Sequence, residues 1–98
     1  MSDQAILEHQ VERITDAVCS EVLRAMRHHG PMHSHHEAYA VIREEFEQEY
    51  WPLVCQNPSK LTRDEQQARL AALHSELIQT AAMCVRAIWD LCEEGVPA

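Results

Sequence analysis

The chain has 98 residues, 46% hydrophobic and 24% charged, with only two glycines and four prolines, which is the composition of one globular domain over residues 1–98 rather than of a disordered chain. Sixteen acidic residues against eight Lys and Arg give a net charge of −8, a field that repels DNA, RNA and anionic membrane surfaces. Because the sequence has neither a signal-peptide pattern nor the roughly 18 apolar residues of a membrane helix, we expect a cytoplasmic protein that binds neither nucleic acid nor membrane.

The first predicted element is an amphipathic helix from Asp3 to His28. Its apolar residues recur at spacings of three and four, which is the pattern of a helix with one buried face: Leu7, Val11, Ile14, Val18, Val22 and Ala25. The Gly30-Pro31 pair that follows ends the helix.

A second helix is predicted to begin at His35. Ser34 and Glu37 fit the capping box, in which the Ser hydroxyl accepts from an amide of the first turn and the Glu reaches back. The predicted apolar stripe is Tyr39, Ile42, Phe46, Tyr50 and Leu53. Because Pro52 disfavours helical geometry at Trp51, we expect the helix to kink or end there.

The third helix is predicted to follow the Asn57-Pro58-Ser59 turn and a second capping box at Thr62 and Glu65, and to run about 30 residues to Cys92 or Glu94. Its apolar residues cover about half of the helix circumference, which is more than two neighbouring helices cover. The sequence therefore predicts an all-α, three-helix subunit that forms an oligomeric helical bundle, as a homodimer or higher homo-oligomer. A self-sufficient three-helix bundle is the alternative.

Cysteines and histidines give weaker indications. Cys19, Cys55, Cys84 and Cys92 are far apart and form no Cys-x-x-Cys pair, so we expect buried thiols rather than a zinc site or a disulfide framework. Five histidines lie within nine residues, which fits an exposed tract, a transition-metal site or a phosphate contact: His28, His29, His33, His35 and His36. His74 projects into the apolar stripe of the third helix and is expected to be an interior or interface residue.

An acidic run on the second helix is the main candidate for chemistry. Glu45 and Glu49 lie one turn apart beside the apolar stripe, where unpaired charge is costly and a cation, an Arg or a proton must compensate it. Carboxylate oxygens are the ligands that Mg²⁺ prefers. With Glu76 of the third helix they form a candidate inter-helix site, and the alternative is a solvated acidic face. Arg43 and Arg86 could neutralise this cluster or meet a phosphate, although pairing with a carboxylate is the commoner role.

Several motifs resemble a known family. They are His36-Glu37-Ala38-Tyr39-Ala40-Val41-Ile42, then Glu44-Glu45 and Tyr50-Trp51, and later Glu76-Leu77-Ile78-Gln79, Ala81-Ala82-Met83 and Arg86-Ala87-Ile88. Over about residues 34 to 92 the chain resembles small MazG-like proteins of phage and bacterial genomes, relatives of the all-α nucleoside triphosphate pyrophosphohydrolases. The resemblance implies Mg²⁺ held between packed helices by Glu45, Glu49, Glu76 and Gln79, with the three glutamates as catalytic residues. It also implies an oligomer in which water attacks a bound nucleoside triphosphate and releases pyrophosphate.

The chain departs from the family pattern at the metal ligands. A Glu-Glu-x-x-Glu segment that begins at Glu44 ends on Gln48, and one that ends on Glu49 begins at Glu45 and has Phe46 in its second place, so one carboxylate is missing in either register. The Glu-x-x-Asp segment that begins at Glu76 ends on Gln79. An amide oxygen brings no charge, so Mg²⁺ affinity should fall. Three hypotheses follow: a Mg²⁺-dependent nucleotide pyrophosphohydrolase or a weakened remnant of one, a catalytically inactive helical homodimer that binds a nucleotide or a protein partner, and a purely structural dimer.

Overall fold

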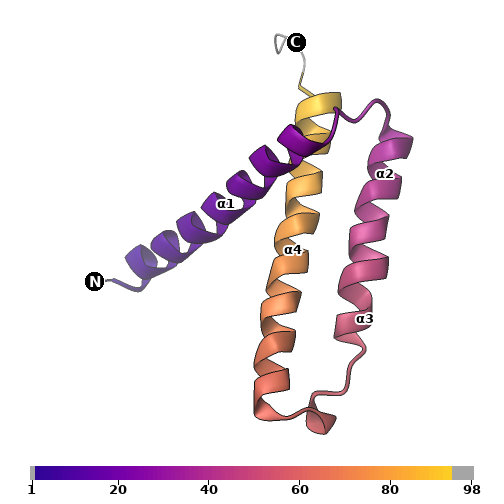
Figure 1. The fold of residues 1–98 in the computed structure, drawn as a ribbon. Coiled ribbons are helices and arrows are strands. Elements are labelled where there is room, and N and C mark those ends of the chain that lie inside the picture. The colour runs from indigo at the N-terminus through magenta and orange to yellow at the C-terminus, as the bar shows by residue number, and fades with distance from the viewer. Residues whose placement is uncertain (1, 94–98) are drawn as a thin grey trace.

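The structure is a computed structural model, and it describes residues 2–93. The described residues form helices and connecting loops without strands, in the order α1 (Asp3–His28), α2 (His35–Arg43), the π-helical segment η1 (Glu44–Tyr50), α3 (Trp51–Val54), the short 3₁₀ turn η2 (Pro58–Lys60) and α4 (Arg63–Leu91). The predicted all-α subunit with three main helices is confirmed, since α2, η1 and α3 follow one another as a single rod (Figure 1).

The predicted helix starts are confirmed by the caps. The Thr62 hydroxyl accepts from the amide of Glu65, and the Glu65 carboxylate accepts from the amide of Thr62, which completes the capping box of α4. At α2 the Ser34 hydroxyl accepts from the amide of Glu37, but the Glu37 carboxylate reaches one residue further back, to the amide of His33. Each cap satisfies amides that have no partner inside the helix.

The second helix does not end at Trp51, so that alternative of the prediction is wrong, and the alternative of a kink stays a prediction. Before Trp51 the helix changes from α-helical to π-helical hydrogen bonding over η1, and the Trp51 amide donates to the carbonyl of Phe46, five residues back. One α-helical turn then follows and ends at Val54. Pro52 lies at the start of that turn, where its missing amide hydrogen costs least. The rod thus continues through Pro52 after a π-helical segment, and this segment carries Glu45 and Glu49.

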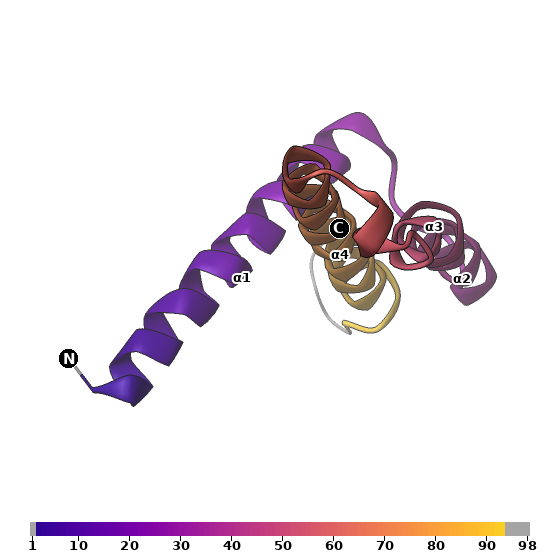
Figure 2. The same ribbon diagram turned by 90° about the horizontal axis from the view of Figure 1, so that it is seen from below.

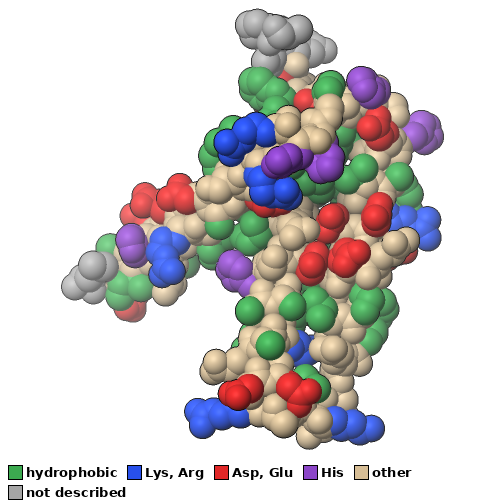
Figure 3. Space-filling model, in the orientation of Figure 1, with side chains coloured by type: hydrophobic (Ala, Val, Ile, Leu, Met, Phe, Trp, Pro, Cys, Tyr) green, Lys and Arg blue, Asp and Glu red, His purple; other side chains and the backbone are tan. Residues whose placement is uncertain are grey.

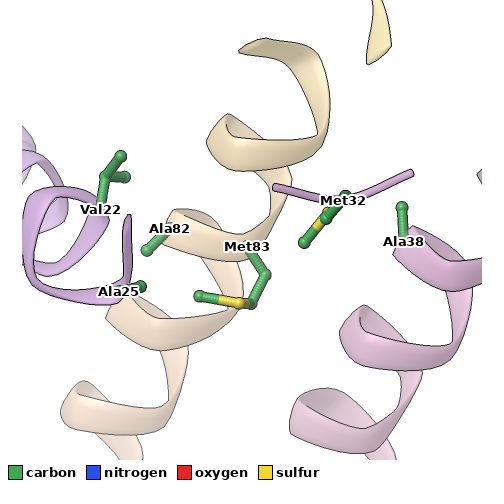
Figure 4. Close-up of a cluster of buried hydrophobic side chains, with 6 residues drawn as sticks. All are labelled: Val22, Ala25, Met32, Ala38, Ala82 and Met83. Atoms are coloured by element: carbon green, nitrogen blue, oxygen red, sulfur yellow. The ribbon is translucent and has the colours of Figure 1, made fainter. Parts of the chain in front are cut away.

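The buried core is small and lies where α1, the loop after it, α2 and α4 meet. Figure 4 shows its six side chains, contributed by all four segments: Val22, Ala25, Met32, Ala38, Ala82 and Met83. The inward face of α2 carries Ala38 and the half-buried Val41 and Ile42. Tyr39 and Phe46, predicted to belong to this face, are exposed. The predicted stripe was therefore wrong at these two positions, whereas Ile42, Tyr50 and Leu53 are half-buried.

The three rods spread apart rather than form a closed bundle. The α2–η1–α3 rod runs antiparallel to α4, whereas α1 meets α4 near the C-terminal ends of both helices and then diverges (Figures 1 and 2). The molecule measures 49 × 39 × 19 Å. As a result Cys19, Cys55 and Cys92 are exposed and Cys84 is only half-buried, so the prediction of buried thiols was wrong. Large apolar side chains of α1 and α4 are likewise exposed, without a covering neighbour among residues 2–93.

Over the described residues, no helix combines the length and the apolar character that crossing a membrane requires.

Candidate functional site

A pocket of about 600 Å³ lies where the C-terminal end of α1, the loop that follows it, the α2–η1 rod and α4 come together. Acidic and basic side chains line different parts of this pocket. Acidic side chains gather between α4 and the α2–η1 rod, and Arg and His side chains lie above them, beside the end of α1 (Figure 3). Four carboxylates and two guanidiniums line it: Glu21, Glu37, Glu44, Glu45, Arg24 and Arg86.

The acidic wall contains a close pair of carboxyl groups from two helices. Burial raises the pKa of Glu45 above its ordinary value, the neighbouring Glu76 carboxyl raises it further, and the charges of Glu49 and Glu44 add to the effect. The Oε2 atoms of both Glu45 and Glu76 are buried, and neither accepts a hydrogen bond from a described residue. A proton or a cation between the two groups would satisfy these oxygens.

The structure brings the predicted site residues together to different degrees. Glu45 and Gln79 line the pocket. Glu76 lies beside Glu45, and Glu49 is exposed but close enough for its charge to act on Glu45. Gln79 points its amide at the Ser75 hydroxyl, 3.5 Å away. Gln48 lines a separate hollow with Tyr39 and Arg43, so it is not part of this pocket.

Glu45 and Glu76 therefore form a close pair, whereas Glu49 is exposed and acts on Glu45 only through its charge. In the part of the chain that the structure describes, no three Asp, Glu, His or Cys side chains are arranged to hold a metal ion. The donor chemistry at the Glu45–Glu76 pair still suits Mg²⁺, because two carboxylate oxygens lack partners and Mg²⁺ is usually held by one or two carboxylates, waters and substrate phosphates.

Arg86 is a buried residue that lines the pocket on the side of the Arg and His side chains. Its side chain is only 5% exposed, and it donates to the carbonyl of Gly30 at 2.9 Å and to the sulfur of Met83 at 3.4 Å. Its buried Nε has no partner among the described residues. The expectation that Arg86 pairs with a carboxylate is wrong, since no described carboxylate forms an ion pair with it; Arg43 does form one, with Glu47 at 2.9 Å. Arg86 instead ties the loop after α1 to α4.

The same loop is held at a second point. The Met32 amide donates to Asp90 of α4 at 2.8 Å, and Met32 itself is buried. Consequently His28, His29 and His33 line the pocket, whereas His35 and His36 stand exposed in the first turn of α2 and do not. The histidine tract is therefore split, and only its first part belongs to the candidate site.

Two site residues were not singled out from the sequence. Arg24 lines the pocket and forms an ion pair with Glu21, a contact that lowers the pKa of Glu21. Their spacing of three residues on a helix is a signal for such a pair, but it does not indicate which face meets the pocket.

His74 is exposed and lines a separate hollow between α1 and α4, so it is not an interior residue of a single chain. Its role at an interface stays a prediction.

Comparison of the chain with protein-family models, with curated proteins and with solved structures found no match.

Proposed function

We propose that this protein is a MazG-like nucleotide pyrophosphohydrolase-type protein, which binds a nucleoside triphosphate together with Mg²⁺ and hydrolyses it, with weakened activity, to a monophosphate and pyrophosphate. It acts in the cytoplasm as a homo-oligomer. The observation that carries the proposal is the pair of inward-facing carboxyl groups, Glu45 and Glu76, whose buried oxygens lack partners at the edge of a pocket that also contains Arg86.

The charges of the pocket favour a nucleotide that arrives with its cation. Carboxylates outnumber guanidiniums among the lining residues, so with neutral histidines a bare phosphate is repelled. Mg²⁺, when bound, supplies positive charge that neutralises both the carboxylates and the triphosphate. Glu45, Glu49 and Glu76, with the amide oxygen of Gln79, are the residues that would hold it. Phosphate oxygens beyond the metal would then meet Arg86, Arg24 and the pocket histidines.

The raised pKa of Glu45 also suits proton transfer. A carboxylate that holds its proton more tightly than usual is a better general base toward water than an ordinary surface glutamate. In the proposed reaction Glu45 takes a proton from water, the water oxygen bonds to the α-phosphorus, and the bond from that phosphorus to the bridging oxygen breaks as pyrophosphate leaves.

The amide at position 79 favours the second candidate function. Gln79 lines the pocket beside Glu45 but brings no charge, so the site has one carboxylate fewer than the resembled family provides. A catalytically inactive helical homodimer that binds a nucleotide or a protein partner is therefore the alternative.

Calorimetry separates these functions. Mg²⁺ is titrated into the protein, and a nucleoside triphosphate is then titrated in the presence of Mg²⁺, while pyrophosphate is measured in the cell afterwards. Binding with pyrophosphate release supports the enzyme, and binding without release supports the inactive nucleotide-binding protein. The absence of heat from both ligands refutes the nucleotide site. Glu45→Gln should weaken binding, whereas Glu47→Gln, on the same rod but paired with Arg43 outside the pocket, should not.

A further inference from the structure

The apolar stripe of α1 is covered along only half of its length. Near the C-terminal end, Val22 and Ala25 are buried and Val18 packs against the core. The same stripe continues toward the N-terminus through Leu7, Val11 and Ile14, which are 60%, 48% and 50% exposed. Because α1 diverges from α4, this half of the helix projects away from the rest of the molecule (Figures 1 and 2). Its apolar face thus has the chemistry of a helix contact without a neighbour.

The part of α4 that α1 leaves uncovered is also apolar. Leu70 and Leu77 are 63% and 46% exposed, and they lie one turn on either side of His74 on the same helix face. A hollow of about 380 Å³ separates this face from α1, between His74 on one side and Ile14 and Ala17 on the other. We call the two facing sets, Leu7, Val11 and Ile14 on α1 and Leu70, His74 and Leu77 on α4, the wedge surface.

The exposed area of the chain is that of a subunit rather than of a compact monomer. The accessible surface is 7551 Å², whereas about 5,700 Å² is expected for a compact monomer of 11.3 kDa. The radius of gyration is 16.3 Å, against about 12.6 Å for a compact domain of this length. The excess of about 1,800 Å² per chain exceeds the roughly 800 Å² that each partner buries in a standard interface. Counted for two chains, it falls in the range of permanent complexes, about 2,000–5,000 Å² in total.

We propose that a second copy of this chain fills the wedge, with the projecting half of α1 of each chain packed against the wedge surface of the other. A second copy is the partner that the apolar stripe of α1 favours. The half of this stripe that contains Val18, Val22 and Ala25 already packs on α4, and the projecting half has the same chemistry. Lengths also match: residues 3–16 extend about 21 Å and residues 63–78 about 24 Å. A two-fold axis then covers both faces of the wedge in both chains. This inference rests on the homo-oligomer of the proposed function and names the surface that forms it, and it is independent of nucleotide binding.

The first test is the mass in solution. Light scattering at micromolar concentration should give twice the 11.3 kDa chain mass. Val11→Glu should raise the dimer dissociation constant by roughly 30-fold or more, because it buries an unpaired charge. Leu23→Glu is the matched control: Leu23 is 53% exposed on the same helix but lies away from the stripe, so the mass should not change. A wild-type mass of one chain, or a dimer that withstands Val11→Glu, overturns the proposal.

A second test does not depend on how a charged variant folds. In a background where the four cysteines are replaced by serine, chains carrying a cysteine on α1 (Leu7→Cys or Val11→Cys) are mixed with chains carrying one on α4 (Leu70→Cys or Leu77→Cys) and oxidised. A disulfide between the two kinds of chain is expected, because the projecting helix lies on the α4 of its partner. Leu23→Cys should form none with either. Disulfides only between two α1 positions would overturn the arrangement in favour of helix-on-helix pairing of the projecting halves.

Discussion

Replacing Glu45 by Gln should make the metal-free protein more stable at neutral pH. Glu45 is a half-buried carboxylate whose pKa is raised first by burial and then by Glu76. Two charges 4 Å apart interact by about 1 kcal/mol in water and about 4 kcal/mol at the effective dielectric constant of a protein surface. Because the pair borders an open pocket, we take the lower end. Glu45→Gln should therefore raise the unfolding free energy by about 1 kcal/mol and the Tm by about 4–8 °C.

The pH dependence gives a stricter form of the same prediction. The pKa of the Glu45 carboxyl has its ordinary value of 4.5 in the unfolded chain and a higher value in the folded chain, so the folded chain holds this proton more tightly. The stability that this proton contributes is complete below 4.5 and is lost as the pH rises through the higher pKa of the folded state. Gln lacks this dependence. The advantage of Glu45→Gln should consequently be absent below pH 4.5, grow above it, and level off once Glu45 is ionised in the folded state.

Added Mg²⁺ should make the wild-type protein more stable than the Glu45→Gln variant. At ten times its dissociation constant, a cation that binds only the folded state stabilises by about 1.4 kcal/mol, and Glu45→Gln should lose most of this gain. Thermal unfolding with and without Mg²⁺, at one protein concentration, measures both effects. Glu47→Gln is the control, since its exposed ion pair with Arg43 contributes little to stability. The reasoning is refuted if Glu45→Gln destabilises the metal-free protein at pH 7 or if Mg²⁺ stabilises both proteins equally.

Three further predictions concern the pocket and the long helix. Gln79→Glu or Gln79→Asp should produce or increase pyrophosphate release, measured with a pyrophosphatase-coupled phosphate assay; no release in any variant would favour the inactive nucleotide-binding protein. Arg86→Met removes the donor to the Gly30 carbonyl and should lower stability in urea by about 1–3 kcal/mol, whereas a neutral result would mean that Arg86 does not hold the loop. Thr62→Ala breaks the capping box of α4 and should cost about 1 kcal/mol, seen as a lower urea midpoint with an unchanged slope.

Local signals in the sequence determined the helices. The spacing of apolar residues and the caps at Ser34 and Thr62 depend on neighbours within one or two turns, so the bounds of α1 and the starts of α2 and α4 agree with the structure. The end of α4 was predicted at Cys92 or Glu94; the helix ends at Leu91, and Glu94 lies outside the described residues. The closeness of Glu45 to Glu76 also follows from the sequence pattern, because residues beside an apolar stripe lie near the helix that the stripe contacts, whereas the metal site of Glu45, Glu49 and Glu76 stays a prediction.

Tertiary structure decided what each helix meets. The sequence could not show that the small Ala38, rather than Tyr39 and Phe46, joins Ile42 at the core, because a helical projection weighs side chains by hydrophobicity, whereas the distance between two helix axes is set by the size of the residues in contact. The π-helical segment, which carries Glu45 beside Glu76, was not predicted either. Likewise, the position of Arg86 in the lining of the pocket depends on a loop 56 residues away in the sequence, a contact that no local pattern encodes.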